Sequence, residues 1–381
     1  MKSIQTILSD KMKAAFKEAH IDENLAKVNV TNRPDLCDFV CNGAMPAAKQ
    51  LHKAPIDIAG DIAGLLKDDG CFKQIEAVKP GFINITISDE FLAEYISGMG
   101  DDPYLGFNRS DKPKKVVMDY GGPNVAKPLH VGHLRSAIIG ESLKRLYRYD
   151  GHEVYGDIHL GDYGLQMGLI ITELKERKPD LVYFDETYEG KYPKEAPFTI
   201  SELEEIYPAA SARSKEDKDY YSSALDATKQ MQEGRRGYVA LLDHIIAVSV
   251  NDLKKNYERL NVSFDLWKGE SDAKPLIAGM IEKMKASGLA HESENALVVD
   301  VEEETDTKTI PPCIVQKSDG AALYATTDLA TILSREQELN PDAYLYLTDK
   351  RQELHFEQVF RCARKTGLVS DKTGLIHISF G

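Results

Sequence analysis

Apolar residues recur at helical spacing through much of the first hundred positions, and one later run alternates between apolar and polar. The apolar positions from Ile4 to Phe16 lie three or four residues apart, which predicts a helix, and further helical stretches follow at 47–51 and 58–65. The run GFINITIS, Gly81 to Ser88, alternates with a period of two and predicts a strand. We expect residues 1–110 to form a small α+β domain, bounded by the Gly-, Asp- and Pro-rich segment at 98–113.

After Lys115 the pattern changes to strands that alternate with helices. A short apolar run predicts a buried strand at 116–119, an amphipathic stretch predicts a helix at 133–149, and a second strand follows at 153–160. This order predicts a βαβ unit, whose two strands are parallel. On one side of its helix the unit carries Leu134, Ile138, Leu143 and Leu146.

The same alternation returns near the C-terminus. Helices are predicted at 328–333 and 354–365, and strands at 343–347 and 375–380. We expect both halves to share one sheet, because the intervening segment is long, polar and mostly helical. The fold class predicted is therefore α/β: a Rossmann-like parallel sheet in a catalytic domain at 111–381, with a helical and β insertion at about 172–300, preceded by the small α+β domain.

Charge and composition narrow the class of protein. The 381 residues carry a net charge of -14, which excludes a general nucleic-acid binder that acts through bulk electrostatics. No signal peptide or membrane-spanning run is apparent, so we expect a cytoplasmic protein with no membrane partner. The five cysteines form no CxxC pair, which predicts reduced thiols and no structural metal.

The loop after the first strand of the parallel sheet, MDYGGPNVAKPLHVGHLRS (118–136), carries the candidate chemistry. The N-terminus of the following helix offers free N–H groups and a positive dipole end to an anion, and phosphate suits both. His130 and His133 flank Gly132 at this point, so both rings can face one anion. A lone histidine in a loop is usually a surface residue, but here the pair, the glycine and the strand-to-helix position coincide. The loop lacks GxGxxG, which weakens a dinucleotide interpretation.

HVGH resembles the HIGH signature of the class I aminoacyl-tRNA synthetases, and its flanks resemble the arginyl-tRNA synthetase family. Further blocks agree in order with that family: GDYGLQ (161–166), FDLWKGES (264–271), KSDGAALYATTDLA (317–330) and DKRQELHFEQVF (349–360). The N-terminal runs APIDIAGDIA and KPGFINITIS are similar to the additional N-terminal domain of the same family. The resemblance thus covers essentially the whole chain.

This resemblance implies an arginine-tRNA ligase that activates L-arginine with ATP and transfers it to tRNA(Arg). ATP would arrive with Mg2+ as a substrate complex. His130, His133 and Lys127 would be the catalytic groups at the phosphates, and Gly132 would complete the ATP site. A lysine is more often a solvated surface residue, but in this family one just before the HIGH block is thought to compensate for a missing KMSKS lysine.

The resemblance also assigns the arginine and tRNA contacts. Arginine would be held by Asp119, Asn124, Tyr324, Asp328 and Gln352, with Asp328 facing the guanidinium. Taken singly, Tyr324 is more often a core residue and Asp328 a helix cap. The D-loop of tRNA would meet Phe82 and Asn84, which point to one face of the predicted strand, although Phe82 could equally be core.

For several neighbouring residues the sequence does not decide between a ligand contact and a structural role. His159, Gly161, Asp162 and Gln166 could line the ATP or arginine site, but GDYG could equally be a tight turn. We expect Trp267 and Ser271 to pack the wall on the substrate side. His355 could be a ligand contact or a buried histidine whose hydrogen bonds are made within the core, and we slightly favour the second.

The sequence departs from the family at two places. Gly121 and Gly122 replace a usual pair of serines, and the chain stops at HISFG, before the KMSKS-type loop and the anticodon-binding domain. We therefore expect a fragment, monomeric and catalytically weak. The alternatives are a module that binds tRNA or arginine without turnover, and another class I synthetase of the glutamyl or cysteinyl type.

Overall fold

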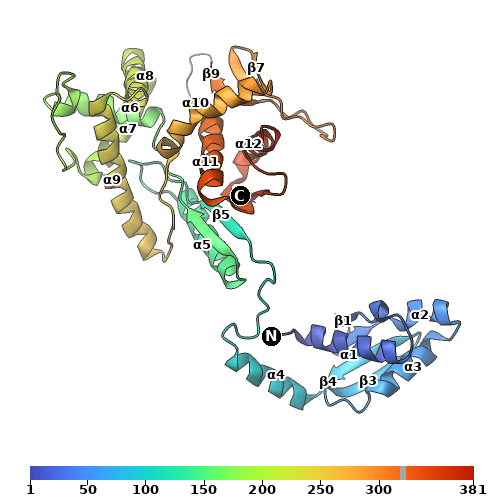
Figure 1. The fold of residues 1–381 in the computed structure, drawn as a ribbon. Coiled ribbons are helices and arrows are strands. Elements are labelled where there is room, and N and C mark those ends of the chain that lie inside the picture. Colours follow the sequence, from blue (N-terminus) through green and yellow to red (C-terminus); the bar gives the residue numbers. More distant parts are fainter. Residues whose placement is uncertain (318–322) are drawn as a thin grey trace. The chain divides into compact units, whose positions relative to one another are not determined.

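The computed structural model describes residues 1–317 and 323–381, so positions 318–322 of the block KSDGAALYATTDLA lie outside the described residues. The chain divides into two compact units, Met1–Asp111 and Lys112–Gly381. Figure 1 shows the elements of each unit.

The first unit is an antiparallel sheet covered by helices. Its sheet has the order β1-β2-β4-β3, and its core is formed largely by apolar residues of α1, α3 and the inner face of β4. On β4 the inward residues Ile83 and Ile85 are fully buried. The elements are α1 (Ile4–Glu18), the 3-10 turn η1 (Glu23–Leu25), β1 (Val28–Val30), β2 (Phe39–Cys41), α2 (Ala44–Leu51), α3 (Pro55–Leu66), β3 (Phe72–Val78), β4 (Phe82–Ile87) and α4 (Asp89–Asp101).

The second unit is built on a four-stranded sheet of order β11-β10-β5-β6, in which every neighbouring pair is parallel. This confirms the predicted α/β fold with a Rossmann-like parallel sheet, and the two halves of the pattern do share one sheet. Its elements are β5 (Lys115–Tyr120), α5 (Val131–Tyr149), β6 (Glu153–Asp157), α11 (Tyr324–Leu339), β10 (Ala343–Asp349), the turn η3 (Lys350–Gln352), α12 (Glu353–Lys365) and β11 (Gly374–Phe380).

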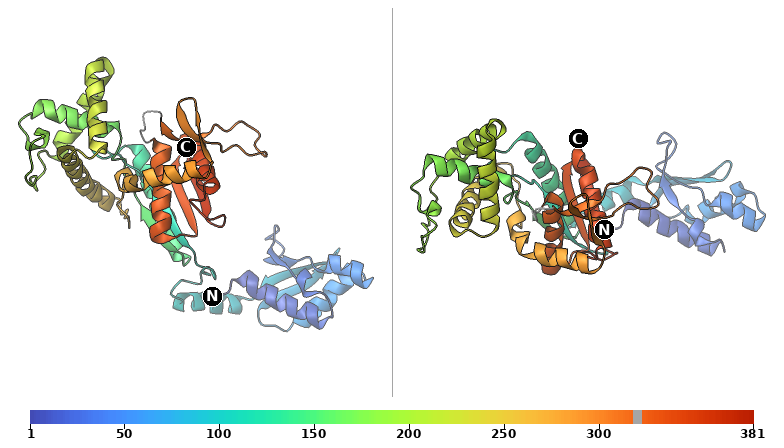
Figure 2. Two further views of the ribbon diagram at one scale, coloured as in Figure 1. Left: turned by 45° about the horizontal axis from the view of Figure 1, so that its top comes forward. Right: turned by 90° about the horizontal axis from the view of Figure 1, so that it is seen from above.

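The chain between β6 and α11 forms two further layers. The first is a group of helices: α6 (Leu165–Arg177), α7 (Ile200–Glu216), α8 (Lys218–Gln232) and α9 (Arg236–Arg259), with the turn η2 (Val182–Phe184). The second is α10 (Glu270–Ala286) with an antiparallel sheet of β7 (Ala290–Ser293), β8 (Ala296–Val299) and β9 (Cys313–Lys317). Figure 1 shows α6 to α9 on one flank of the parallel sheet and α10 to α12 on the other, and both views of Figure 2 keep these layers apart.

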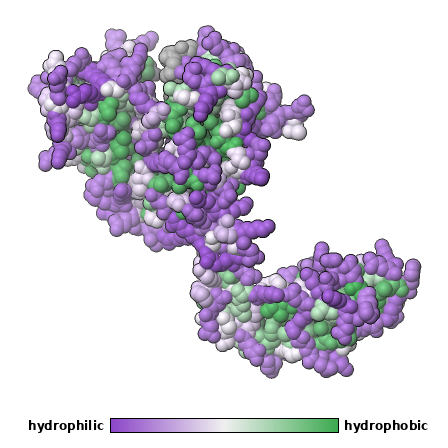
Figure 3. Space-filling model, viewed as in Figure 1, coloured by the Kyte–Doolittle hydropathy of each residue, from purple (hydrophilic) through white to green (hydrophobic). Residues whose placement is uncertain are grey.

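The parallel sheet is buried on both faces, as its connections require. Alternate residues of β5 enter different cores: Val116 and Met118 pack with α5 and the helices α6 to α9, whereas Val117 packs with α10, α11 and α12. In the space-filling view hydrophilic residues cover most of the visible surface, with apolar residues in narrower seams (Figure 3). Among the described helices, none combines the length and apolar character needed to cross a bilayer.

Helix α5 buries a different side from the one its leucines suggest. Ile138 is 50 % exposed and Leu146 is 61 % exposed. The buried residues of this helix are instead small or charged: Ser136, Ala137, Gly140, Glu141 and Lys144. A Cβ atom on Gly140 would lie 2.3 Å from the Tyr120 ring, so the small residues let the helix approach the sheet closely.

The buried charges on α5 satisfy each other. Lys144 is fully buried and pairs with Glu141 at 2.8 Å, and its ammonium also donates to Ser263. The Tyr120 hydroxyl donates to Glu141 and to the Ser263 carbonyl. This network fixes α5 to the segment that follows α9, because a buried charge left without its partner costs several kcal/mol.

A second buried network fixes α11 to the sheet. Arg335 is 2 % exposed, and its Nη2 donates to Asp119 Oδ2 at 2.6 Å and to Asp157 Oδ2 at 2.7 Å. Its Nη1 donates to the Tyr346 hydroxyl at 2.9 Å. Asp119 lies in register with both Asp157 and Tyr346, so one guanidinium joins neighbouring positions on three parallel strands.

Replacing Arg335 by Met should destabilise the fold strongly, because it leaves two carboxylates buried together with no counter-ion. Breaking such a pair typically costs about 3–5 kcal/mol. We expect urea unfolding of Arg335→Met to show a loss of this size in the free energy of unfolding. The matched control is Arg351→Met, which removes a pair with Asp349 whose arginine side chain is 88 % exposed and should leave the midpoint nearly unchanged. Equal midpoints for the two variants would refute this account of the sheet.

Candidate active site at the carboxyl ends of the strands

The loop from Tyr120 to His130 joins the carboxyl end of β5 to α5, at the point where the sheet order reverses. From β5 the chain passes to β6 on one side, whereas β10 lies on the other, and crevices at such switch points bind ligands in open α/β sheets. Asn124 forms a parallel bridge with Gly161, which ties this loop to the one after β6. Gly121 and Gly122 have φ of +91° and +43°, a region that residues with a Cβ seldom adopt, which gives the unusual glycine pair a structural reason.

The two histidines of the loop are brought together at the start of α5. Their ring centroids lie 3.6 Å apart and their planes are inclined by 19°, so the rings are stacked. His130 is the N-cap of α5, and its Nδ1 accepts the Gly132 N–H at 3.1 Å. His133 Nδ1 accepts the His130 N–H at 3.4 Å.

These backbone contacts fix which nitrogen of each ring remains available. Because each Nδ1 accepts a hydrogen bond, each neutral ring must carry its proton on Nε2. Each ring therefore presents one Nε2–H donor, together with the free N–H groups of the helix N-terminus. Burial, and after it the charges of His130 and Lys127, lower the pKa of His133 to about 4. His133 is thus a neutral hydrogen-bond donor at pH 7.

Gly132 allows this arrangement. A Cβ atom at this position would lie 2.9 Å from His130 Cε1 and 3.0 Å from His130 Nδ1, closer than side chains tolerate. Any larger residue would push the His130 ring away from the helix N-terminus. The glycine between the histidines is therefore needed for the ring position as well as for close approach of a ligand.

Lys127 reaches from the same loop toward the helical layer. Its ammonium lies 4.7 Å from the ring centroid of Tyr207, on α7. Both elements line a cavity of about 420 Å³ between the loop, α7 and α9, whose wall includes Asn124, Lys127, Glu204 and Asp252. Tyr207 was not recognised from the sequence, where it stands in a long polar helical run.

Asp328, one turn into α11, faces two histidines. Its Oδ2 lies 2.5 Å from His355 Nε2 and its Oδ1 lies 3.6 Å from His159 Nε2. Burial alone would raise the pKa of Asp328, but the bonds from His159 and His355 outweigh it and lower this pKa to about 2. Burial opposes the charge of His159, but Asp328 and Asp119 raise its pKa to about 9. A protonated His159 therefore lies near two carboxylates, and its buried Nδ1 has no hydrogen-bond partner among the described residues.

Glu270 and Asp162 add two carboxyl groups, of which the sequence indicates Asp162 as a possible lining residue and does not single out Glu270. Glu270, at the start of α10, is 8 % exposed. Burial, helped by the charges of Asp162 and Asp328 and opposed by His159, raises the pKa of Glu270 to about 7. Asp162 accepts from the Ser271 N–H and hydroxyl, so GDYG is a turn that also anchors α10. The only sequence signal for Glu270 was its place in the block FDLWKGES.

The remaining predicted arginine contacts differ in their exposure to solvent and in the partners that they already have. Asp119 is 6 % exposed and its Oδ2 is bound by Arg335, whereas Gln352 is exposed as the N-cap of α12. Tyr324 opens α11 and is 71 % exposed, although the pKa of its hydroxyl is raised by partial burial and by Glu270 and Tyr207. In the first unit Phe82 and Asn84 lie half-buried on the outer face of β4, so Phe82 is not part of the buried core.

Comparison with known proteins identifies the fold and its family. The model for tRNA synthetases class I (R), catalytic domain, matches residues 102–381, and that for the arginyl tRNA synthetase N terminal domain matches residues 2–87. Among solved structures, the arginyl-tRNA synthetases of Plasmodium falciparum and Thermus thermophilus are similar, with TM-scores of 0.73 and 0.66 at 23 % and 19 % identity. They cover 100 % and 99 % of this chain, which covers 65 % and 66 % of theirs, and at such identity they show the fold alone.

Curated relatives are much closer in sequence. The arginine–tRNA ligase of Agathobacter rectalis is 62 % identical and that of Alkaliphilus oremlandii 54 % identical, each over 100 % of this chain. The chain spans 64 % of the length of each. Because the catalytic-domain model matches more than half of the chain, the chain belongs to the arginyl-tRNA synthetase family of the class I tRNA synthetases.

Proposed function

We propose that this chain carries the activation chemistry of an arginine-tRNA ligase, in which ATP and L-arginine form arginyl-adenylate and the arginyl group passes to tRNA(Arg). The observation that carries the proposal is the stacked imidazole pair at the start of α5, whose two Nε2–H donors are fixed by the backbone. A second set of groups, acidic and buried, lies on neighbouring loops of the same sheet edge. Donors for an anion and carboxylates for a cation are what this pair of substrates requires.

In the proposed first step the arginine carboxylate attacks the α-phosphate of ATP, and pyrophosphate leaves. Negative charge builds up on the phosphate oxygens, and the protein has little covalent chemistry to supply. His130 and His133 would donate to these oxygens from Nε2, and Lys127 would add a positive charge. Because the donors are held before ATP binds, they need little reorganisation in the transition state. Mg2+ would enter with the ATP phosphates, because this ion usually keeps several waters and binds through substrate phosphates.

The proposed arginine pocket lies around Asp328. A planar guanidinium favours bidentate pairing with a carboxylate, and Asp328 is ionised even at low pH. Glu270 approaches the same place, because the charges of His159 and Asp328 act on its pKa and its own charge raises the pKa of Tyr324. Asn124 and the free oxygen of Asp119 would hold the α-amino group, and Tyr324 and Gln352 would close the pocket. In this pocket the protonated His159 and a hydrogen bond with His355 would hold Asp328 until the substrate cation arrives.

The first unit would supply a contact to tRNA. Phe82 and Asn84 lie on the outer face of β4, where a ring can stack on an unpaired base and an amide can bond its edge. Acidic residues slightly outnumber basic ones in residues 1–110, so we propose that stacking and shape contribute more here than charge. We further propose that the protein acts as a monomer in the cytoplasm.

Arginine-dependent exchange of pyrophosphate into ATP tests the proposal, with and without tRNA(Arg). Exchange supports the ligase, whereas binding of tRNA or arginine without exchange supports a binding module. Replacing His130 or His133 by Ala should each lower exchange on the order of 100-fold, as loss of one charge-stabilising donor commonly does. His291→Ala, on an exposed strand of the same unit, is the matched control and should exchange normally. Undiminished exchange by both active-site variants would exclude the imidazole pair from the reaction.

Replacing Asp328 by Asn should weaken arginine binding and leave ATP binding intact. Removing one partner of a buried charge pair costs about 2 kcal/mol or more, which is roughly a 30-fold loss of affinity. Calorimetric titration with arginine and with ATP measures the two effects separately. Asp306→Asn is the control, because that carboxylate pairs with Arg361 and has no contact with Asp328. Unchanged arginine affinity would place the guanidinium elsewhere.

The charge of the pocket also predicts how stability depends on pH. The pKa of His159 is raised to about 9 in the folded state and is near 6.5 in the unfolded chain. Its stabilising effect is therefore complete below pH 6.5 and is lost as the pH rises through 9, by about 1.4 kcal/mol for each unit of the shift. Urea unfolding between pH 6 and 9.5 should show this decline in the native protein. It should be missing in His159→Asn, because Asn does not titrate. Asn is chosen because it tolerates the φ of +43° at this position. Parallel profiles would mean that His159 is neutral.

A further inference from the structure

The Lys127 ammonium has an unusual environment for a lysine beside several acidic residues. The ammonium lies over the aromatic ring of Tyr207, with 4.7 Å between its nitrogen and the ring centroid. In the part of the chain that the structure describes, no carboxylate lies within 4.0 Å of it. Glu204, one turn before Tyr207 on α7, shares the same cavity and forms no such pair. The positive charge of Lys127 is therefore held without being neutralised.

Tyr207 is itself held in place by packing on two sides. Its ring packs against the main core beside the parallel sheet and against the small cluster of Leu169, Ala210, Tyr220 and Ala224 between α6, α7 and α8. It is also close enough to Tyr324, at the start of α11, to raise the pKa of that hydroxyl. A residue of the helical layer thus reaches the edge of both proposed substrate sites.

The other neighbour of Lys127 is the imidazole pair. Its positive charge contributes, after burial and His130, to the low pKa of His133. The ammonium therefore contacts the Tyr207 ring and also acts electrostatically on His133. A lysine side chain has four rotatable bonds and loses much conformational freedom when it is fixed, so a residue that holds it beforehand makes ligand binding less costly.

We propose that Tyr207 is a positioning residue, whose ring holds the Lys127 ammonium beside His130 and His133 in readiness for the ATP phosphates. A ring face attracts a cation through its quadrupole and leaves the full charge available, which a carboxylate partner would not do. This inference rests on the proposed function for the role of ATP. The placement of Lys127 by Tyr207 is independent of that function and can be measured without it.

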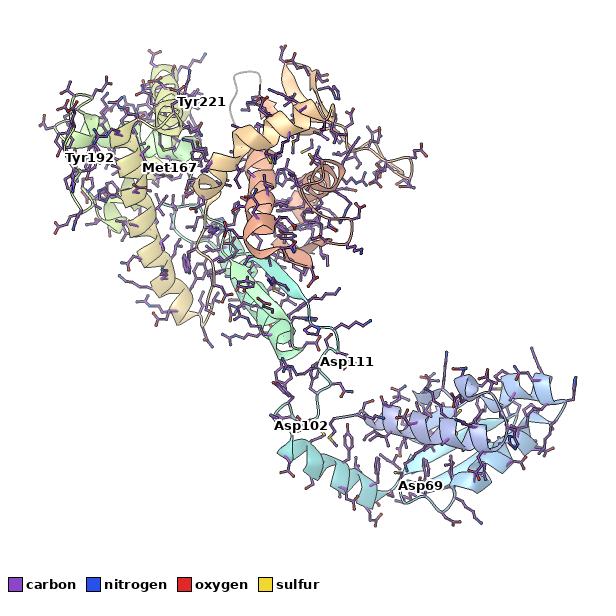
Figure 4. All side chains as sticks on the ribbon, in the orientation of Figure 1. Asp69, Asp102, Asp111, Met167, Tyr192 and Tyr221 are labelled. Carbon is purple, nitrogen blue, oxygen red and sulfur yellow. The ribbon has the colours of Figure 1, made fainter. Side chains whose placement is uncertain are left out.

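The first test follows the titration of His133 by NMR in the 381-residue chain. Lys127→Met removes the charge and should raise the pKa of His133. Tyr207→Leu should raise it by a similar amount, because the freed ammonium moves away, whereas Tyr207→Phe keeps the ring and should leave it unchanged. Tyr221→Leu, on α8 of the same helical layer, is the matched control (Figure 4). A His133 titration in Tyr207→Leu that matches the native protein would overturn the proposal.

The second test is a double-mutant cycle on the affinity for ATP with Mg2+, measured by calorimetry. A cation–π contact near the surface is worth about 1 kcal/mol, so Tyr207→Leu should weaken ATP binding about fivefold in the native background. In the Lys127→Met background the same change should have almost no effect, since no ammonium remains to be held. Tyr207→Phe should retain the native affinity. Equal losses in the two backgrounds would mean that Tyr207 acts only through packing, which contradicts the proposal.

A failure of the proposed function can be distinguished from a failure of the proposal for Tyr207. If the native chain bound no ATP, the activation chemistry would be refuted, and the His133 titration alone would decide the role of Tyr207. Thermal melting of each variant by circular dichroism excludes general unfolding as the cause of a change. A Tyr207→Leu chain that melts like Tyr221→Leu and shows both predicted effects supports the proposal.

Discussion

The buried Arg335 guanidinium is the interaction on which the active edge of the sheet depends. Without it, Asp119 and Asp157 would bring two negative charges together in register on neighbouring strands, inside the protein. With it, the ends of β5, β6 and β10 are joined to α11, the helix that also carries Asp328. The sheet edge and the proposed arginine pocket are thus set by one cation, and this cation and the three groups it joins, Asp119, Asp157 and Tyr346, are stable only as a set.

The phosphate end of the site depends on the backbone more than on side-chain packing. The Nδ1 atoms of His130 and His133 accept hydrogen bonds from the first N–H groups of α5 and its N-cap, so helix formation and the choice of tautomer occur together. Gly132 is the one position where a Cβ would break this arrangement. The donors are therefore a consequence of folding and need no ligand to be oriented, which is the property that transition-state stabilisation requires.

The sequence allowed the parallel sheet, the strand-to-helix loop and its histidine pair to be predicted, because each is a local pattern of spacing. It did not allow Arg335 to be recognised, since its partner Asp119 lies 216 positions away and its helix looks ordinary. The buried side of α5 was missed for a related reason: hydrophobic periodicity points to Ile138 and Leu146, whereas Glu141 and Lys144 are buried because they pair with each other. Tyr207 belongs to the same group, because its partners come from elements far apart in the chain. Long-range charge pairing leaves no local signal.

The two ends of the site differ in how their charges are balanced, and this difference suits the proposed substrates. At the arginine end Asp328 is matched by two histidines, which a substrate cation can replace as a partner. At the phosphate end the donors are two imidazoles and a lysine that contacts a ring, and among the described residues no carboxylate pairs with this lysine that would have to be displaced before an anion binds. A carboxylate paired with Lys127 would have to be separated from it before the anion binds, at a cost of up to about 1 kcal/mol for a partly exposed pair. The helical layer avoids that cost by contributing an aromatic ring where an acidic residue, Glu204, stands only one turn away.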